Sequence, residues 1–281
     1  MGILSKYTSQ LAVFEASKAT AKIDTSIESR KDVSSSVHIE VRGLKKRFGE
    51  HDVLRGISLD ILRGKINVVV GGSGAGKTVL MKHLVGLIRP DSGQINVDGV
   101  DIARQSEREL NQTRLSFGMA FQYAALFDSM TVEENLIFPL MEHRKDKYSK
   151  KEMRALVSGR LEDLGLPGIM DRMPMDLSGG MRKRVGFVRA TILEPSVIFY
   201  DEPTTGLDPV ATKQIDDMIA NISRKQGVTS VVISHDMAST FRIADQIALL
   251  EKGAITQVGT PVELRKNPAG QLAQFLEISG V

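Results

Sequence analysis

The chain contains no cysteine, and only 5% of its 281 residues are aromatic. The absence of cysteine excludes disulfides, thiolate metal sites and cysteine nucleophiles. The five histidines are scattered along the chain, which argues against a zinc site. The 37 basic and 34 acidic residues nearly cancel, so the net charge of +3 gives no indication of a nucleic-acid partner.

Long apolar runs are also missing. The longest uninterrupted apolar runs, such as 68–70 and 247–250, have the length of strands, whereas a membrane-spanning helix needs about 20 residues. The apolar residues at 11–14 are cut short by Glu15, which is not typical of a signal peptide. We therefore expect a chain that neither crosses a membrane nor is secreted. Residues 1–37 are rich in Ser, Thr, Lys and Ala and are predicted to form a flexible extension, with a weak amphipathic helix through Leu11 and Phe14 that touches lipid or a partner as the alternative.

A glycine loop at 71–78 reads Gly-Gly-Ser-Gly-Ala-Gly-Lys-Thr and matches the pattern G-x-x-x-x-G-K-T in full. It follows an apolar strand-like run and precedes a helical segment, so its N–H groups and the helix dipole are predicted to bind phosphate. Lys77 is expected to contact the β- and γ-phosphates, and the Thr78 hydroxyl to ligate Mg²⁺. A plain glycine turn is the alternative, against which the Lys-Thr pair argues. The predicted phosphate-binding residues are Gly71, Gly72, Ser73, Gly74, Ala75, Gly76, Lys77 and Thr78.

Polar residues follow two further apolar strands. The run 197–202 ends in Asp201 and Glu202, and strand burial explains its aliphatic residues but not its acids. Asp201 suits a Mg²⁺ contact through water, and Glu202 suits a general base for the water that attacks the γ-phosphate. His235 ends the run 229–235. A lone histidine is commonly structural, but its place after a strand in this chain favours a γ-phosphate contact.

Three other positions are ambiguous on their own. Gln122 follows a strand-like segment at 117–120, where nucleotides bind in parallel sheets, but a single glutamine indicates little. Phe48 could stack on an adenine ring or be an ordinary core residue. Ser178 is predicted to cap a helix, and the glycines beside it, Gly179 and Gly180, indicate a second anion site.

The remaining pattern predicts an α/β fold. Alternating residues at 38–42 and 57–61 indicate an antiparallel β layer ahead of the glycine loop, and 131–164 indicates helices inserted into the α/β core. The helix after the glycine loop is expected to stop at Pro90 and to bury an apolar face. The members of that face are Leu80, Leu84, Leu87 and Ile88.

These motifs, in this order, resemble the nucleotide-binding subunits of ABC transporters over residues 38–276. The matching motifs are Walker A at 71–78, the Q-loop at Gln122, the signature at 177–181, Walker B at 197–202, the D-loop at 206–208 and the switch histidine at His235. The resemblance implies a P-loop NTPase core of mostly parallel strands with an N-terminal antiparallel layer. It also implies a helical subdomain at about 123–195, and residues 277–281 would form a short C-terminal tail.

The resemblance also assigns roles and partners. Phe48 would stack on adenine, Gln122 would ligate Mg²⁺ with Thr78 and Asp201, and Asp208 would lie at the nucleotide. Two copies would dimerise head to tail, each ATP lying between the P-loop of one subunit and residues 178–180 of the other. An integral-membrane permease would hold the dimer at the cytoplasmic face of the inner membrane, and no nucleic acid is expected.

Met181 replaces the glutamine usual in the signature, and its thioether cannot donate a hydrogen bond to a nucleotide sugar. The signature with methionine, together with 121–127 and 134–136, looks like the ATPase of Mla-type phospholipid transport systems, which work with MCE proteins. Three alternatives remain: the ATPase of a polar-solute transporter, for instance for an amino acid; a non-transport ABC ATPase, which usually carries two cassettes or long coiled coils; and a binding module without turnover. The presence of Glu202 and His235 argues against the last.

Overall fold

The computed structural model describes residues 37–268, 270, 272–273 and 276–277. Apart from residues 37 and 277, the predicted N-terminal extension and C-terminal tail lie outside this part. The described chain carries two sheets, one of six strands and one of four.

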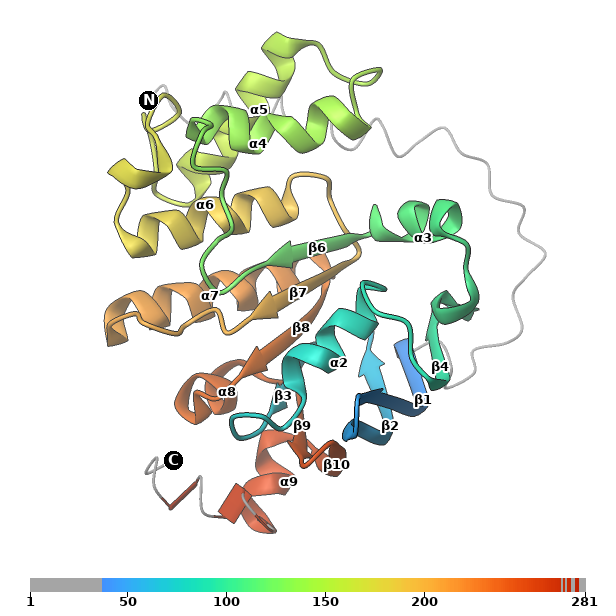
Figure 1. Cartoon of the computed structure of the whole chain (residues 1–281). Coiled ribbons are helices and arrows are strands. Elements are labelled where there is room, and N and C mark those ends of the chain that lie inside the picture. Colours follow the sequence, from blue (N-terminus) through green and yellow to red (C-terminus); the bar gives the residue numbers. More distant parts are fainter. Residues whose placement is uncertain (1–36, 269, 271, 274–275, 278–281) are drawn as a thin grey trace, which may run out of the picture. The chain divides into compact units, whose positions relative to one another are not determined.

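The six-stranded sheet has the order β10-β9-β3-β8-β7-β6 and forms the centre of the fold (Figure 1). Its parallel strands are β3 (Ile66–Val70), β6 (Phe117–Ala120), β7 (Val197–Asp201), β8 (Thr229–Ser234) and β9 (Gln246–Glu251). Strand β10 (Ala254–Gly259) pairs with β9 in the antiparallel sense through a turn at Lys252 and Gly253. Both faces of the sheet are covered, which explains why β3, β7 and β8 are buried along nearly all of their length.

The four-stranded sheet is the predicted antiparallel layer, with the order β2-β1-β4-β5. It consists of β1 (Val37–Phe48), β2 (His51–Leu62), β4 (Ser92–Val97) and β5 (Val100–Asp101). Its inner residues share one hydrophobic cluster with α2 (Lys77–Leu84), α3 (Glu107–Arg114) and one face of the six-stranded sheet. The α/β architecture predicted from the sequence is confirmed.

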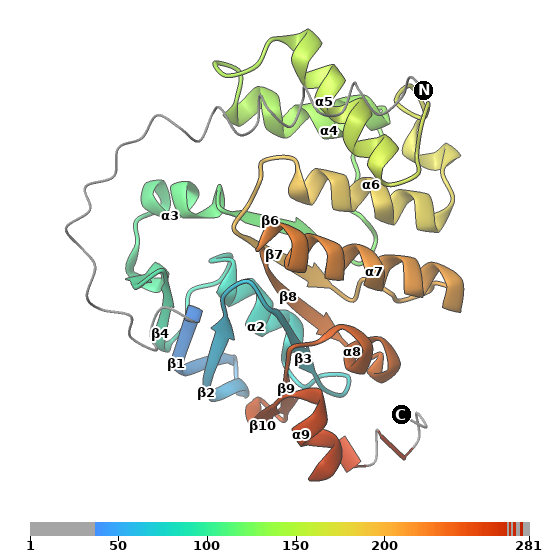
Figure 2. The same cartoon turned by 180° about the vertical axis from the view of Figure 1, so that it is seen from behind.

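The opposite face of the six-stranded sheet is covered by helices. Residues from α6 (Gly179–Thr191), α7 (Pro209–Gln226), α8 (Met237–Ile243) and α9 (Pro261–Lys266) share its second cluster. Beyond α6 lie α4 (Val132–His143) and α5 (Lys150–Asp163), with a short 3-10 turn, η3 (Pro174–Asp176), before α6; Figures 1 and 2 agree that α6 lies between these helices and the sheet. A third cluster joins α4, α5 and α6. Within the described ranges, no helix is long and apolar enough to span a bilayer.

One helix prediction is wrong in its extent. Helix α2 ends at Leu84, well before Pro90, and the Leu87 side chain is 57% exposed. The chain leaves the helix through Gly86 at φ 70°, where a Cβ would overlap the side chain of Leu110. The left-handed glycine turns the chain away from the core, so Leu87 loses the burial that helical spacing predicted.

Candidate active site

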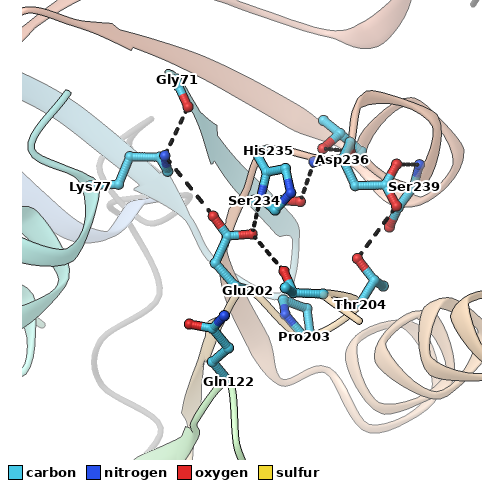
Figure 3. Close-up of polar contacts among 12 residues, drawn as sticks. Gly71, Lys77, Gln122, Glu202, Pro203, Thr204, Ser234, His235, Asp236 and Ser239 are labelled. Atoms are coloured by element: carbon cyan, nitrogen blue, oxygen red, sulfur yellow. Dashed lines mark hydrogen bonds and ion pairs between the residues drawn. The ribbon is translucent and has the colours of Figure 1, made fainter. Parts of the chain in front are cut away.

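The predicted catalytic residues lie together at one edge of the six-stranded sheet. In the parallel register, Val70 is opposite Ser234 and Asp201 is opposite Ile233, so β3, β7 and β8 end side by side. The residues that follow these ends come from three distant parts of the chain, and Figure 3 shows the side chains of Lys77, Glu202 and His235 directed toward one another. Polar groups at the carboxyl ends of parallel strands are placed where ligands bind in such folds.

The glycine loop leaves its backbone open to an anion. Gly76 caps α2 in the left-handed conformation at φ 106°, no side chain caps the helix, and no acidic residue occupies its first turn. Gly71 has no room for a side chain, because a Cβ would overlap the carbonyl oxygen of Leu250. The positive end of α2 therefore remains available to phosphate oxygens, and the loop fits a polyphosphate.

Lys77 is folded back over its own loop. Its Nζ donates hydrogen bonds to the carbonyl oxygens of Gly71 at 2.8 Å and Gly72 at 3.1 Å and lies 4.0 Å from Oε1 of Glu202. The side chain is only 11% exposed. Backbone carbonyls and a carboxylate thus hold the ammonium at the mouth of the loop, where phosphate oxygens could replace them.

Glu202 is held by both its backbone and its side chain. Its backbone has φ 48°, and its N–H donates to the carbonyl oxygen of Ile233 at 3.0 Å. Oε2 lies 2.6 Å from Nδ1 of His235 and accepts a hydrogen bond from the Thr205 hydroxyl at 3.3 Å. A left-handed non-glycine backbone costs free energy, and such residues cluster at functional sites. The Glu202 side chain is 15% exposed and that of His235 62% exposed.

These groups enclose a cavity of about 460 Å³. Its lining residues are Gly71, Gly72, Ser73, Lys77, Glu202, His235 and Met237. The cavity joins phosphate-binding backbone, a cation and a hydrogen-bonded carboxylate, which are the groups that phosphoryl transfer to water requires.

Asp201 is a half-buried carboxylate next to a second carboxylate, Glu202. Burial and then the neighbouring Glu202 carboxylate raise the pKa of Asp201, and the charges of Lys77 and Lys82 lower it. A divalent ion would stabilise this carboxylate in its charged form. Among the described residues there is no group of three or more histidine and carboxylate ligands, so an ion here would also need oxygen ligands from hydroxyls, amides or the nucleotide. Thr78 is an exposed residue, and its hydroxyl fits this requirement.

The other predicted positions lie around this centre. Gln122 follows β6, and its amide donates to the Tyr123 hydroxyl at 3.4 Å, without a contact to Glu202 in Figure 3. Phe48 is 45% exposed beneath the Lys46 ammonium, 5.5 Å from its ring centroid, so the core alternative is wrong and adenine stacking stays a prediction. Asp208 caps α7 by accepting from the N–H groups of Val210 and Ala211, each at 2.9 Å.

The predicted second anion site is not part of this cavity. Ser178 caps α6 by accepting from the Met181 N–H at 3.3 Å, and Gly179 and Gly180 begin the helix. Figure 1 shows α6 well apart from α2 and the glycine loop. A single chain therefore does not bring residues 178–180 to its own Lys77.

Sequence reasoning missed two residues of the site. Thr205 donates to Glu202, and the buried ammonium of Lys183 donates to the carbonyl oxygens of Pro203 at 2.8 Å and Thr205 at 2.6 Å. Nothing in the sequence separates Lys183 from the arginines on either side of it, because its burial follows only from how α6 packs. Thr205 could have been noticed from its position three residues after Glu202 in a turn.

Comparison with known proteins identifies the family. The ABC transporter family model matches residues 54–205. The chain is 40% identical to the probable ribonucleotide transport ATP-binding protein mkl of Mycobacterium leprae, over 85% of this chain and 69% of that protein. It is 36% identical to the intermembrane phospholipid transport system ATP-binding protein MlaF of Haemophilus influenzae, over 85% of this chain and 90% of that protein.

The methionine import ATP-binding protein MetN of Carboxydothermus hydrogenoformans is also 40% identical, over 75% of this chain and 62% of that protein. Among solved structures, the fold matches the dimeric, post-hydrolysis ATP-binding cassette MJ0796 bound to ADP and Pi, with a TM-score of 0.74 and 26% identity over 79% of this chain and 98% of that chain. The chain therefore belongs to the ABC transporter family, as an ATP-hydrolysing subunit whose activity is coupled to transport.

Proposed function

We propose that residues 38–276 form one ATPase domain, with a helical insertion at 123–195, in which Glu202 is the general base of ATP hydrolysis. The observation that carries this proposal is the position of its carboxylate, 2.6 Å from His235 and 4.0 Å from Lys77 beside the glycine loop. Glu202 would take a proton from water as the water oxygen bonds to the γ-phosphorus and the bond to the β–γ bridging oxygen breaks. ADP and phosphate are the products.

Other residues of the cavity bind and orient the nucleotide in this proposal. Lys77 would exchange the carbonyls of its own loop for phosphate oxygens, and His235 would orient Glu202 and contact the γ-phosphate. Phe48 would stack on the adenine ring. Thr78, Gln122 and Asp201 would hold Mg²⁺, which when bound neutralises charge on the phosphates.

The complete site would need two subunits. Residues 178–180 lie outside the cavity of their own chain and carry an exposed helix start, which suits a nucleotide held by a partner. The dimeric MJ0796 cassette supports this arrangement. Asp208, which follows Glu202 in the chain, would lie at the same interface.

The membrane partner would dock beside Gln122. A cavity of about 360 Å³ opens between α4, α6 and the end of β6, and the aromatic side chains of Phe121, Phe127 and Phe138 line it. An apolar surface of this kind suits a helix of an integral-membrane permease. The permease would hold the subunit at the cytoplasmic face of the inner membrane.

We infer that the cargo is phospholipid and that an MCE-type protein is a further partner. The Met181 signature and the match along 90% of MlaF support this inference. A polar solute is the second candidate, because the identity to MetN is 40%, against 36% to MlaF. The permease would make the contacts with the cargo, so the residues of this chain would not indicate directly which cargo is transported.

The test is extraction of the assembled transporter with its native partners, followed by mass spectrometry of bound small molecules and proteins. We expect phospholipid and an MCE-type protein in the complex, and no stimulation of the isolated subunit by phospholipid. Recovery of an amino-acid-binding or sugar-binding protein without lipid would overturn the phospholipid assignment and leave the ATPase mechanism intact.

A further inference from the structure

Helix α6 carries a buried lysine, Lys183, whose ammonium is held by backbone carbonyls. Lys183 is 9% exposed, and within the described part of the chain it forms no ion pair. Burial lowers the pKa of its ammonium, and the charge of Glu202 partly opposes this effect. A buried cation is costly unless it makes good hydrogen bonds, and a methionine of similar length would fill the same space without that cost. Packing alone therefore does not explain why an ammonium lies at this position.

Both hydrogen bonds of Lys183 hold the loop that positions the catalytic base. Its Nζ donates to the carbonyl oxygens of Pro203 at 2.8 Å and Thr205 at 2.6 Å, one and three residues after Glu202. The same turn is closed by the Leu207 N–H, which donates to the Thr204 carbonyl oxygen at 3.2 Å. Lys183 thus fixes the backbone on both sides of Thr204, between the carboxylate and residues 206–208.

The Thr204 side chain ties the same turn to the strand end that carries His235. Its hydroxyl donates to Oδ2 of Asp236 at 3.4 Å, and Figure 3 draws this contact beside Glu202. The turn after Glu202 is therefore held from β8 on one side and from α6 on the other. Of these two supports, the one from Lys183 comes from a helix, α6, and the one from Asp236 comes from the end of a sheet strand.

Helix α6 packs in two hydrophobic clusters at once. Val185 and Val188 pack in the cluster shared with α4 and α5, whereas Phe187 and Ala190 pack in the cluster under the sheet. Ser178 caps the start of the helix and precedes Lys183 by about 7.5 Å along the axis, at 1.5 Å rise per residue. A packed helix moves as a unit, so a shift of its N-terminus reaches the ammonium.

We propose that Lys183 is a positioning residue that links the nucleotide contact made by residues 178–180 to the placement of Glu202 in the same subunit. The inference rests on the proposed function, in which Ser178 contacts the partner's ATP. Closing of the dimer on that ATP sets the orientation of α6, and Lys183 passes this orientation to the turn after Glu202. Each subunit would then hydrolyse its own ATP efficiently only when the ATP on its partner is in place.

The test compares three variants in the complex of the subunit with its permease. Lys183→Met keeps length and apolar volume but removes both donors, Lys183→Gln keeps an N–H₂ donor without charge, and Arg184→Met is the matched control. Arg184 is a cation on the same helix whose Nη1 donates to the Leu164 carbonyl oxygen at 3.1 Å, away from Glu202. The measurements are kcat and KM for ATP, ATP affinity, and thermal unfolding to establish the folded fraction.

For Lys183→Met we expect kcat per folded complex to fall by about tenfold to hundredfold, because small displacements of a catalytic group have effects of this size. KM and ATP affinity should stay unchanged, since the glycine loop is untouched. Lys183→Gln should recover part of the lost kcat. Arg184→Met should lower only the unfolding temperature.

A normal kcat in Lys183→Met, or an equal loss in Arg184→Met, would overturn the proposal. If Lys183→Met does not assemble with the permease, Lys183→Ala is measured instead, and the same loss of kcat is expected. The smaller alanine side chain leaves room for water to hydrogen-bond the carbonyls of Pro203 and Thr205, so the fold is kept. Failure of the proposed function is distinguishable: it would appear as normal turnover in Glu202→Gln, whatever the Lys183 variants do.

Discussion

Replacing Glu202 by glutamine tests the centre of the site with the smallest change of shape. Oε2 of Glu202 lies 2.6 Å from Nδ1 of His235 and 3.3 Å from the Thr205 hydroxyl, and the amide oxygen of the glutamine can still accept both hydrogen bonds. The backbone at φ 48° and its bond to Ile233 do not involve the side chain. What the variant loses is the ability to accept a proton from water.

The expected loss in kcat is about 10²-fold to 10⁴-fold, the usual contribution of a general base. At 1.36 kcal/mol per tenfold, this corresponds to about 3–5 kcal/mol in the activation free energy. ATP binding should persist or tighten, because the substitution removes a negative charge located 4.0 Å from Lys77, where phosphates are expected.

Phosphate release by the purified complex gives kcat, and calorimetry on the isolated subunit gives ATP affinity. Glu162→Gln is the control, since Glu162 is an exposed carboxylate on α5 that accepts a hydrogen bond from Ser158 at 3.2 Å. It should hydrolyse ATP normally. A kcat for Glu202→Gln within about tenfold of the unmodified complex would refute the role of Glu202 as base.

Three further outcomes are expected. Ser178→Arg, introduced into the Glu202→Gln variant, should abolish ATP-dependent dimers in light scattering, while calorimetry should still detect ATP binding. Dimers that persist in this double variant would contradict the two-subunit site. Gly71→Ala should lower the unfolding temperature and ATP affinity, because the new Cβ overlaps the carbonyl oxygen of Leu250, whereas Gly159→Ala in open space on α5 should be neutral or slightly stabilising. Burial lowers the pKa of His83 below its ordinary 6.5, so the unfolded state takes up the proton first and stability should fall as pH drops below that value. His83→Met should weaken this acid sensitivity in thermal unfolding at about pH 7.5 and about pH 5.5, and an unchanged sensitivity would exclude His83 as its source.

Some features are predictable from the sequence because their cause is local. The glycine loop is one uninterrupted segment whose residue types determine both backbone shape and charge, and strand–loop–helix order follows from its neighbours. The cap predicted at Ser178 is confirmed, and Thr131 and Asp208 cap their helices in the same way, since a cap depends on residues at most three positions apart. The acidic end of β7 was recognisable because burial of a strand does not account for carboxylates.

Other features depend on contacts between distant segments and could be found only in the tertiary structure. Glu202 and His235 are 33 positions apart, and their 2.6 Å contact follows from the parallel register of β7 and β8. Leu87 fits a helical stripe, but Gly86 packs against Leu110 and turns the chain outward. Lys183 is indistinguishable in sequence from a solvated lysine, and it is buried because α6 packs on two hydrophobic clusters at once. The sequence by itself determined the chemical groups and the local backbone that presents them, whereas packing of the sheet and α6 decided which of those groups meet, because burial and distance are properties of the assembled fold.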